Sequence, residues 1–321
     1  MSAEPAILIA GPTASGKSGL ALAIARAFDG VVINADSMQV YSDLRILTAR
    51  PDDEALAAAP HRLYGMLSGA ELCSVGRWRE MALDEMAASR QVGRVPVVVG
   101  GTGLYLKALE SGLSPMPTVS PAVRERVRRF HRRFGNEALR QRLAVSDPVS
   151  YERIPPGDSQ RLLRALEVLE SSGRPLSAWQ QENPAEPAPY RFLTVSLMPD
   201  RERLYTAINR RFLSMLEQGA LDEAAALLRK GYPGDRPIMK ALGVPELAAH
   251  LYGSLSLEAA VSAAQRASRR YAKRQLTWQR TQLQRQKASF LDVQTEDLQI
   301  RCDEIFPKIR QFLLTSSAGR G

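Results

Sequence analysis

The sequence predicts an α/β protein in which helices flank a parallel sheet and a helical domain is inserted into the chain. Short apolar runs alternate with helical stretches in both terminal parts of the chain, which is typical of a parallel sheet covered on both faces. The middle of the chain reads as helices only and is bounded by proline-rich stretches at residues 114–121 and 183–189. We therefore expect a core domain of residues 1–113 and 190–321 and a helical insertion of residues 114–189.

The expected elements follow from the apolar pattern in chain order. We predict strands at residues 7–10, 31–35, 95–99, 191–197 and 289–293. The helices of the core are expected at residues 19–28, 104–109, 201–217, 221–230, 238–250 and about 257–286, with a last helix after residue 293. Those of the insertion are expected at residues 124–134, 136–143 and 159–171.

The first strand runs directly into a phosphate-binding loop (P-loop) of the pattern Gly-x-x-x-x-Gly-Lys-Ser. Its glycines permit backbone conformations in which successive N–H groups turn inward around an anion. The following helix adds the positive end of its dipole, Lys17 adds a charge, and the Ser18 hydroxyl is a ligand for Mg²⁺. The pattern predicts a site for at least a diphosphate, formed by Gly11, Pro12, Thr13, Ala14, Ser15, Gly16, Lys17 and Ser18.

Two more stretches follow predicted strand ends, residues 36–39 and residues 100–103. Ligands of parallel sheets bind at the carboxyl ends of the strands, so one crevice can hold both stretches and the P-loop. Asp36 is the only carboxylate at an early strand end. It is expected to assist a metal or act as a base on a nucleophile, or else to be a helix cap or turn carboxylate. The guanine-reading motif Asn-Lys-x-Asp is absent from the sequence, which argues against a GTPase.

Basic residues outnumber acidic ones by 43 to 34, which favours a polyanionic partner. Residues 259–291 contain no acidic residue, and their basic residues recur at helical spacing, interleaved with Tyr271 and Trp278. These are Arg266, Arg269, Arg270, Lys273, Arg274, Arg280, Arg285 and Lys287. Such a stripe is expected to contact nucleic-acid phosphates, the alternative being a surface helix with incidental charge. The predicted insertion carries a second basic cluster, Arg124, Arg126, Arg128, Arg129, Arg132 and Arg133.

A third pattern is the helix that starts near residue 159, where Gln160, Arg161 and Arg164 precede a run of leucines. Positive charge near a helix start is unfavourable unless an anion offsets it. A phosphate or an RNA backbone would do so, and incidental surface charge is the alternative.

Little else in the sequence points to a cofactor or a membrane. Cys73 and Cys302 have no neighbours at metal-ligand spacing, which favours a reduced cytosolic protein. The N-terminal apolar run stops at Gly11, too short for a signal peptide, and no stretch approaches the length of a membrane span. We expect a cytoplasmic protein without membrane contact.

Taken together, five motifs in order resemble the tRNA dimethylallyltransferase (tRNA isopentenyltransferase) family, over about residues 5–313, in its bacterial form without a zinc finger. They are Gly-Pro-Thr-Ala-Ser-Gly-Lys-Ser at 11–18, Asp-Ser-Met-Gln-Val-Tyr at 36–41, Val-Gly-Gly-Thr-Gly-Leu-Tyr at 99–105, Gln-Arg-Leu-Leu-Arg-Ala-Leu-Glu-Val at 160–168 with Gly-Arg-Pro-Leu at 173–176, and Arg-Tyr-Ala-Lys-Arg-Gln-Leu-Thr-Trp at 270–278. One motif departs: where the family usually has Asp-Ile-Gly-Thr-Ala-Lys-Pro, this chain has Leu47 for the glycine and Arg50 for the lysine.

The resemblance implies that the P-loop binds the diphosphate of dimethylallyl diphosphate with Mg²⁺, and that the acceptor is the N6 amine of the adenosine 3′-adjacent to the anticodon of a tRNA. Asp36 would be the general base, while Thr13, Lys17, Ser18 through Mg²⁺, and Arg161 or Arg164 would bind the leaving diphosphate. Contacts with the tRNA anticodon stem-loop would come from Asp36, Ser37, Met38, Gln39, Thr102, Arg124, Gln160, Arg161, Leu162, Leu163 and Arg164, together with the basic-stripe residues Arg270, Lys273 and Arg274.

Two other functions stay open at this point. A P-loop kinase of small molecules would use ATP at the same loop, and a non-catalytic RNA-binding NTPase switch would also hydrolyse it. A prenyl transferase needs no ATP, so ATP consumption separates both from the first hypothesis. We expect the protein to act as a monomer.

Overall fold

The computed structural model describes residues 3–182, 186–283, 290–293 and 298–315. It divides into two compact units, Met1–Glu110 with Ala188–Gly321, and Ser111–Pro187. The expected insertion, residues 114–189, begins three residues later and ends two residues later than the second unit. We call the first the sheet unit and the second the helical unit.

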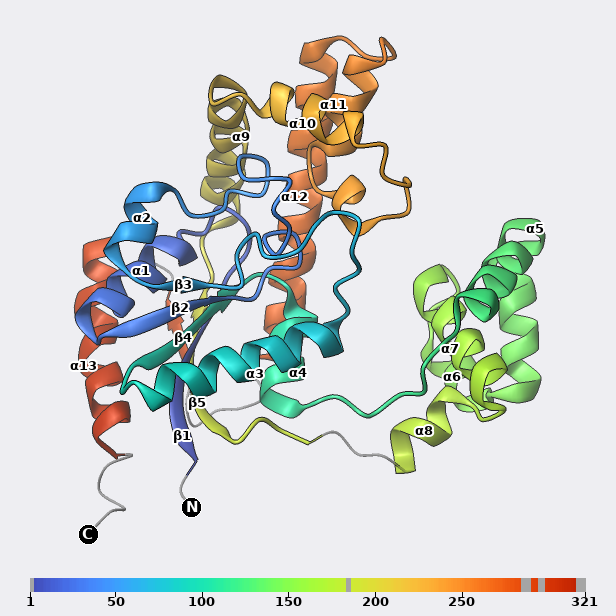
Figure 1. Ribbon diagram of the computed structural model, residues 1–321, viewed down its shortest axis with the longest axis horizontal. Helices are drawn as coiled ribbons and strands as arrows, with labels where there is room; N and C mark the ends of the chain where they lie inside the picture. Colours follow the sequence, from blue (N-terminus) through green and yellow to red (C-terminus); the bar gives the residue numbers. More distant parts are fainter. Residues whose placement is uncertain (1–2, 183–185, 284–289, 294–297, 316–321) are drawn as a thin grey trace. The chain divides into compact units, whose positions relative to one another are not determined.

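The described residues of the sheet unit form six strands, all of whose pairings are parallel. They are β1 (Glu4–Ala10), β2 (Gly30–Asn34), β3 (His61–Arg62), β4 (Val95–Gly100), β5 (Tyr190–Leu197) and β6 (Phe290–Val293), in the spatial order β3-β2-β4-β1-β5-β6 (Figure 1). In this register Ala10 at the end of β1 lies between Gly100 of β4 and Ser196 of β5. The carboxyl ends of the central strands therefore meet at one edge of the sheet, and the predicted α/β fold class is confirmed.

Helices cover both faces of this sheet because side chains alternate along each strand. From β1, Ile7 and Ile9 pack against α1 (Lys17–Ala27) and α13 (Leu298–Thr315), which also contact each other through a T-shaped pair of Phe28 and Phe306. Leu8 faces the opposite layer. That layer contains α3 (Val75–Gln91), α4 (Gly103–Ser111), α9 (Arg201–Glu217), α10 (Ala220–Arg229), α11 (Val244–Leu251) and α12 (Leu257–Gln282).

Several elements differ from the sequence prediction. The stretch expected as one helix at 238–250 is a short 3-10 helix, η1 (Pro237–Lys240), and α11, because Gly243 between them has φ +92°. The two-residue strand β3 and the short helices α2 (Asp53–Ala58), α6 (Pro148–Arg153) and α8 (Leu176–Glu182) were not predicted, since none has a periodic apolar pattern long enough to detect. The longer helix α3 was also not predicted, because its buried positions include the small residues Ala82 and Ser89 beside Trp78 and Met86. Residues 284–286 of the expected long helix and Ser289 of the expected last strand lie outside the described residues.

The helical unit consists of α5 (Pro121–Ser146), α6 (Pro148–Arg153), α7 (Ser159–Ser172) and α8 (Leu176–Glu182). The two helices expected at 124–134 and 136–143 are the halves of α5, which breaks at Gly135 with φ 74° and ψ −172°. Apolar side chains from α5 and α7 form its core. The buried carboxylate of Asp147 joins α6 to α8 by accepting hydrogen bonds from the hydroxyls of Ser150 and Ser177, both at 2.6 Å.

None of the helices formed by the described residues combines the length and the apolar character needed to cross a lipid bilayer.

Candidate functional site

The P-loop connects β1 to α1, and its backbone takes left-handed conformations at Ala14 (φ +61°) and Gly16 (φ +81°). Glycine is required at position 16 for a second reason. A Cβ there would lie 2.6 Å from Nη1 of Arg301, a buried arginine of α13 that donates a hydrogen bond to the Ser15 carbonyl at 3.0 Å. Ala14 is not a glycine, so its conformation costs on the order of 1 kcal/mol or more, as is common at functional sites.

Lys17 is the first residue of α1, and its amino group is surrounded by protein although part of its side chain is exposed. Nζ donates a hydrogen bond to the Pro12 carbonyl at 3.2 Å. Burial lowers the pKa of Lys17 from 10.5 to about 8; the negative charge of Asp36 acts in the opposite direction, and the positive charge of Arg211 lowers the pKa further. Three charged groups from α1, α9 and the end of β2 therefore influence one another at the P-loop.

Arg211 was not predicted as a site residue. It projects from α9, and burial lowers its pKa while Asp36 raises it. Together with P-loop residues 14–19 it lines a cavity of about 540 Å³. Two largely desolvated cations in one cavity repel each other, and a bound anion with two or more charges would relieve that repulsion. The cavity is therefore suited to a diphosphate.

Asp36 is placed by a buried asparagine at the end of β2. The Asn34 carboxamide accepts a hydrogen bond from the Asp36 N–H at 2.8 Å and donates one to the Asp36 carbonyl at 3.0 Å. Oδ1 of Asp36 accepts a hydrogen bond from the Met38 N–H at 2.9 Å. Within the described part of the chain, Oδ2 has no donor assigned to it, so one carboxylate oxygen is available to a substrate.

The glycines at residues 100–103 are explained by close backbone approaches. A Cβ on Gly100 would lie 2.1 Å from the Ala35 carbonyl oxygen, and a Cβ on Gly101 would lie 2.2 Å from Nε2 of Gln275. At Gly103 it would lie 2.3 Å from the ring of Trp278. These glycines therefore let the end of β4 touch both the end of β2 and the helix α12.

Gln275 connects the predicted site stretches, and it too was not singled out from the sequence. It is 6% exposed; its Oε1 accepts a hydrogen bond from the Thr13 N–H at 2.9 Å, and its Nε2 donates one to the Gly101 carbonyl at 2.8 Å. Thr102 in turn accepts a hydrogen bond from the Ser37 N–H at 3.0 Å. The structure thus brings the P-loop, residues 36–39 and residues 100–103 into one site. No local signal in the sequence marks Gln275, because Ser268 and Gln279 are uncharged polar residues on the same buried face of α12.

Gln39 makes hydrogen bonds within the chain, and its predicted contact with RNA stays a prediction. Its Nε2 donates hydrogen bonds to the carbonyls of Thr48 at 2.8 Å and Ala49 at 3.1 Å. Its side chain therefore supports the stretch that contains the unusual Leu47 and Arg50, and only its remaining surface is open to a ligand.

The basic stripe on α12 is largely solvent-facing. Arg266, Arg270, Lys273, Arg274 and Arg280 are exposed, whereas Arg269 turns inward to donate a hydrogen bond to Asn209 Oδ1 at 2.5 Å. Arg274 also lies 5.5 Å from the centre of the Tyr271 ring. Arg285 and Lys287, which we included in the stripe, lie outside the described residues.

In the helical unit the structure changes the interpretation of residues 160–164. Leu162 is fully buried in the core of that unit, so the expectation that its side chain contacts RNA is wrong, and Leu163 packs against the same core. Arg161 Nε lies 3.4 Å from Oδ2 of Asp158, the cap of α7, so a carboxylate of the chain already offsets this charge. Gln160 and Arg161 are exposed, and Arg124 is half-buried. The guanidinium of Arg164 lies 4.0 Å from the Glu167 carboxylate. The predicted contacts of these four residues with diphosphate or RNA stay predictions.

Residues 39–282 match the family model described as IPP transferase, and residues 5–68 match that described as isopentenyl transferase. The chain belongs to the IPP transferase family. It is 55% identical over 281 residues to the tRNA dimethylallyltransferase of Rhodospirillum centenum, which covers 87% of this chain and 90% of the relative. It is 50% identical over 315 residues to the tRNA dimethylallyltransferase of Paramagnetospirillum magneticum. This match covers 98% of this chain and 99% of the relative.

Solved structures of the family have the same fold. The full-length tRNA isopentenylpyrophosphate transferase of Bacillus halodurans is 32% identical, with a TM-score of 0.71 and 99% of both chains covered. A eukaryotic dimethylallyltransferase, described as acting on tRNA, is 25% identical with a TM-score of 0.80, covering 95% of this chain and 80% of the other.

The lowered pKa of Lys17 predicts a pH dependence for anion binding. Below pH 8 Lys17 is charged in the free protein, and above it the charge is lost, so affinity for an alkyl diphosphate that is fully ionised in this range should fall about tenfold per pH unit. The buried tyrosines Tyr64 and Tyr271 do not titrate between pH 7 and 9.5. Burial raises their pKa values most, and the negative charge of Asp36 raises them further. Calorimetry between pH 7 and 9.5 measures the effect.

The matched control is Lys17→Arg, whose guanidinium keeps its proton throughout that range. Its affinity should be independent of pH even if its absolute value changes. A flat profile for the unmodified protein would show that Lys17 does not supply a titrating charge to the diphosphate site.

Proposed function

We propose that this protein transfers a dimethylallyl group from dimethylallyl diphosphate to the N6 amine of the adenosine 3′-adjacent to the anticodon in a tRNA, releasing diphosphate. The observation that carries the proposal is the arrangement of Lys17 and Arg211 at the P-loop beside the open carboxylate oxygen of Asp36. Membership of a family whose members are named tRNA dimethylallyltransferase supports the assignment of both substrates.

The diphosphate would bind in the cavity lined by the P-loop and Arg211. The start of α1 would contribute the positive end of its helix dipole, and Lys17 and Arg211 would supply charge. Loss of these contacts would raise the energy of the leaving group, because its negative charge increases as the C1–O bond breaks. Thr13 lies in the same loop, and its hydroxyl would hydrogen-bond the bridging oxygen.

Mg²⁺ would be held by Ser18 together with oxygens of the diphosphate. Ser18 is exposed beside Lys17 at this cavity, which fits an ion that keeps several waters and uses few protein ligands. The described residues contain no group of three or more His, Cys, Asp or Glu that could hold a metal alone. When bound, the ion would neutralise part of the charge on the leaving diphosphate.

The proposed reaction forms a bond between N6 and C1 of the prenyl group as the bond from C1 to the bridging oxygen breaks. The amine must lose a proton, and Asp36 would accept it through the carboxylate oxygen that has no donor in the described structure. To reach that oxygen the adenine must leave the anticodon stack. Ser37 and Thr102, joined by a hydrogen bond, and Met38 lie next to Asp36 and would contact the base.

The exposed side chains of the basic stripe would contact tRNA phosphates. Because Gln275 on the buried side of the same helix binds Thr13 and Gly101, the stripe has a fixed position relative to the catalytic site. We also propose that the protein acts as a monomer, since one chain supplies all the site residues, Lys17, Asp36, Arg211 and Gln275. A tRNA substrate would place this activity in the cytoplasm.

A small-molecule kinase is the weaker candidate. Kinases of the P-loop class place a carboxylate for the metal after a strand of the core, whereas β4 ends in Gly-Gly-Thr-Gly. The relatives described above are named as transferases of a prenyl group, which favours the first proposal.

The direct test incubates the protein with unmodified tRNA and dimethylallyl diphosphate, with and without ATP, and measures prenylated adenosine by mass spectrometry. We expect product in both mixtures at the same rate. Product only with ATP, or ATP hydrolysis without prenylation, would contradict the proposal.

Changing Asp36 to Asn tests the base. A general base typically contributes about 10²–10⁴ in rate, so kcat should fall by that factor while both substrates still bind. Single-turnover rates of Asp36→Asn across a Mg²⁺ titration also test the alternatives. Full rescue of the rate by Mg²⁺ would show that Asp36 is a metal ligand. A nearly normal rate without added metal would show that it is a turn residue. Asp200→Asn, at the cap of α9, is the control and should retain activity.

Changing Arg270 or Lys273 to Ala tests the basic stripe. Each change should weaken tRNA binding and lower the slope of log affinity against log salt by about one phosphate contact. Turnover at saturating tRNA should be retained, since neither residue lies at the P-loop. Arg310→Ala, on the exposed side of α13, removes the same charge elsewhere and should leave the slope unchanged.

A further inference from the structure

Two side chains from outside the P-loop bind its backbone. Gln275 of α12 accepts a hydrogen bond from the Thr13 N–H at 2.9 Å. Arg301 of α13 donates one through Nη1 to the Ser15 carbonyl at 3.0 Å, and it is 3% exposed. Arg301 lies beyond residue 282, where the matches to the family models end. The motifs that assign the chain to its family therefore give this arginine no role.

The helix α13 is packed against the helix that begins at the P-loop. Its side chains Ile305 and Ile309 are buried among those of β1 and α1, and the ring of Phe306 makes a T-shaped contact with Phe28 at the end of α1. Figure 1 shows α13 beside α1. Because Arg301 lies one and two turns before the two isoleucines, its backbone has a fixed position relative to α1.

The guanidinium of Arg301 lies directly against Gly16. A Cβ at Gly16 would be 2.6 Å from Nη1 and 3.7 Å from Cζ of the arginine. Among the residues that the structure describes, no acceptor is assigned to the Gly16 N–H. In a trans peptide the carbonyl and the N–H of the next residue point in opposite directions. Since Arg301 holds the Ser15 carbonyl toward α13, the Gly16 N–H points away from α13.

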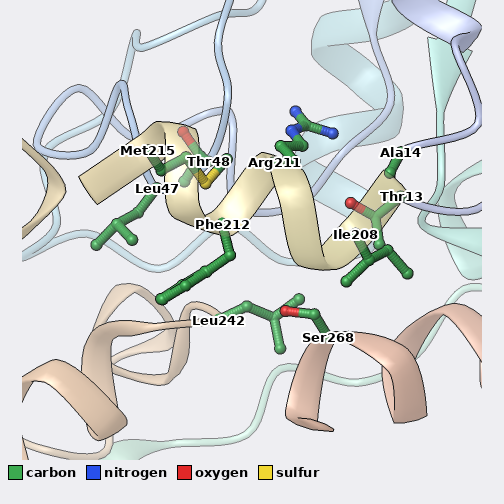
Figure 2. Close-up of a pocket in the computed structure, with 10 residues that line it drawn as sticks. All are labelled: Thr13, Ala14, Leu47, Thr48, Ile208, Arg211, Phe212, Met215, Leu242 and Ser268. Atoms are coloured by element: carbon green, nitrogen blue, oxygen red, sulfur yellow. The ribbon is translucent and has the colours of Figure 1, made fainter. Parts of the chain in front are cut away.

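The cavity in which we place the diphosphate lies on the side of the loop opposite to α13. Its lining comes from residues 14–19 and from α9, which packs on the other face of the sheet. Figure 2 shows Arg211 of α9 on the same side of the chain as Ala14 of the loop. An N–H group at Gly16 that points away from α13 is therefore directed at the cavity.

We infer that Arg301 is a positioning residue for the diphosphate site, an inference that rests on the proposed function. By binding the Ser15 carbonyl, it keeps the Gly16 N–H directed at the diphosphate before the ligand arrives. Ala14 and Gly16 both have positive φ angles, so the loop needs such contacts to keep its conformation without an anion. A donor that is already oriented stabilises developing charge without reorganisation. Arg301 acts through the backbone and does not contact the ligand.

The test compares the unmodified protein with Arg301→Met, which removes the donor and keeps a long unbranched side chain. Calorimetry measures the affinity for inorganic diphosphate with Mg²⁺ at a temperature at which both proteins are folded. We expect affinity to fall about 10–100-fold, the effect of losing one hydrogen bond to a charged group. Affinity for tRNA should not change. Unchanged affinity for diphosphate in folded Arg301→Met would overturn the inference.

Two variants separate the hydrogen bond from the packing of α13. Arg301→Lys keeps a charged donor and should recover most of the affinity for diphosphate. Cys302→Ala removes a buried group from the next position of α13, so it should lower Tm and leave this affinity unchanged. An equal loss of affinity in Cys302→Ala would show that helix packing, not the hydrogen bond, orders the loop, and would overturn the inference.

Prenylation of tRNA by the unmodified protein tests the proposed function separately. If prenylation is absent and Arg301→Met still weakens diphosphate binding, the proposed function is wrong and the role of Arg301 at the loop is retained. If prenylation is present and the affinity of Arg301→Met is unchanged, only the inference about Arg301 is wrong.

A measurement on the unmodified protein keeps the test decisive if Arg301→Met does not fold. In protein labelled with ¹⁵N-glycine, the amide proton of Gly16 should move downfield when diphosphate and Mg²⁺ are added, because a hydrogen bond to an anion deshields it. A Gly16 signal that does not move at saturating diphosphate would overturn the inference without any substitution.

Discussion

Two cations, Lys17 and Arg211, line one cavity beside the P-loop, and burial lowers the pKa of both. The lowered pKa of Lys17 comes first from burial; the negative charge of Asp36 raises it, and the positive charge of Arg211 lowers it further. A multiply charged anion would add negative charge beside both cations and so favour their charged forms. Other elements of the sheet unit complete this site. Arg211 comes from α9 and Asp36 from the segment after β2, and Arg301 of α13 donates a hydrogen bond to the Ser15 carbonyl of the P-loop.

The helix α12 joins two functions that are separate in chemistry. Its buried side presents Gln275 to the P-loop and to Gly101, while its exposed side carries the basic stripe. A helix is stiff over this length, so a phosphate backbone bound to the stripe is held at a fixed distance from the diphosphate site. The glycines after β4 make this possible, because a side chain at Gly101 or Gly103 would push α12 away from the sheet.

The parts of this site that follow strand ends could be predicted from the sequence, because a strand, a tight turn and a helix start all leave local signals. The P-loop, Asp36 and residues 100–103 belong to this class. Arg211 and Gln275 left none, since their importance arises from how α9 and α12 pack over the sheet. Leu162 shows the reverse error: a residue inside a functional motif was taken for a contact residue, although its apolar spacing on α7 marks it as core. Arg161 shows what the sequence pattern left out: Asp158, the cap of α7, lies 3.4 Å from its guanidinium, while its contact with an anion stays a prediction.

A P-loop fixes where a diphosphate binds but not which of its bonds breaks. Attack on phosphorus would require a carboxylate and metal around the terminal phosphate, and the end of β4 offers glycines instead. Attack on carbon requires that the diphosphate be held as a leaving group and that the chain attached to it lie in apolar surroundings. A small cavity of about 50 Å³ shares Ala14 and Arg211 with the P-loop cavity, and Ile208, Phe212 and Leu242 supply part of an apolar lining there (Figure 2). Arg211 lines both cavities, so it lies where the charged and apolar halves of the donor would join, and C1 of the donor would be held next to it.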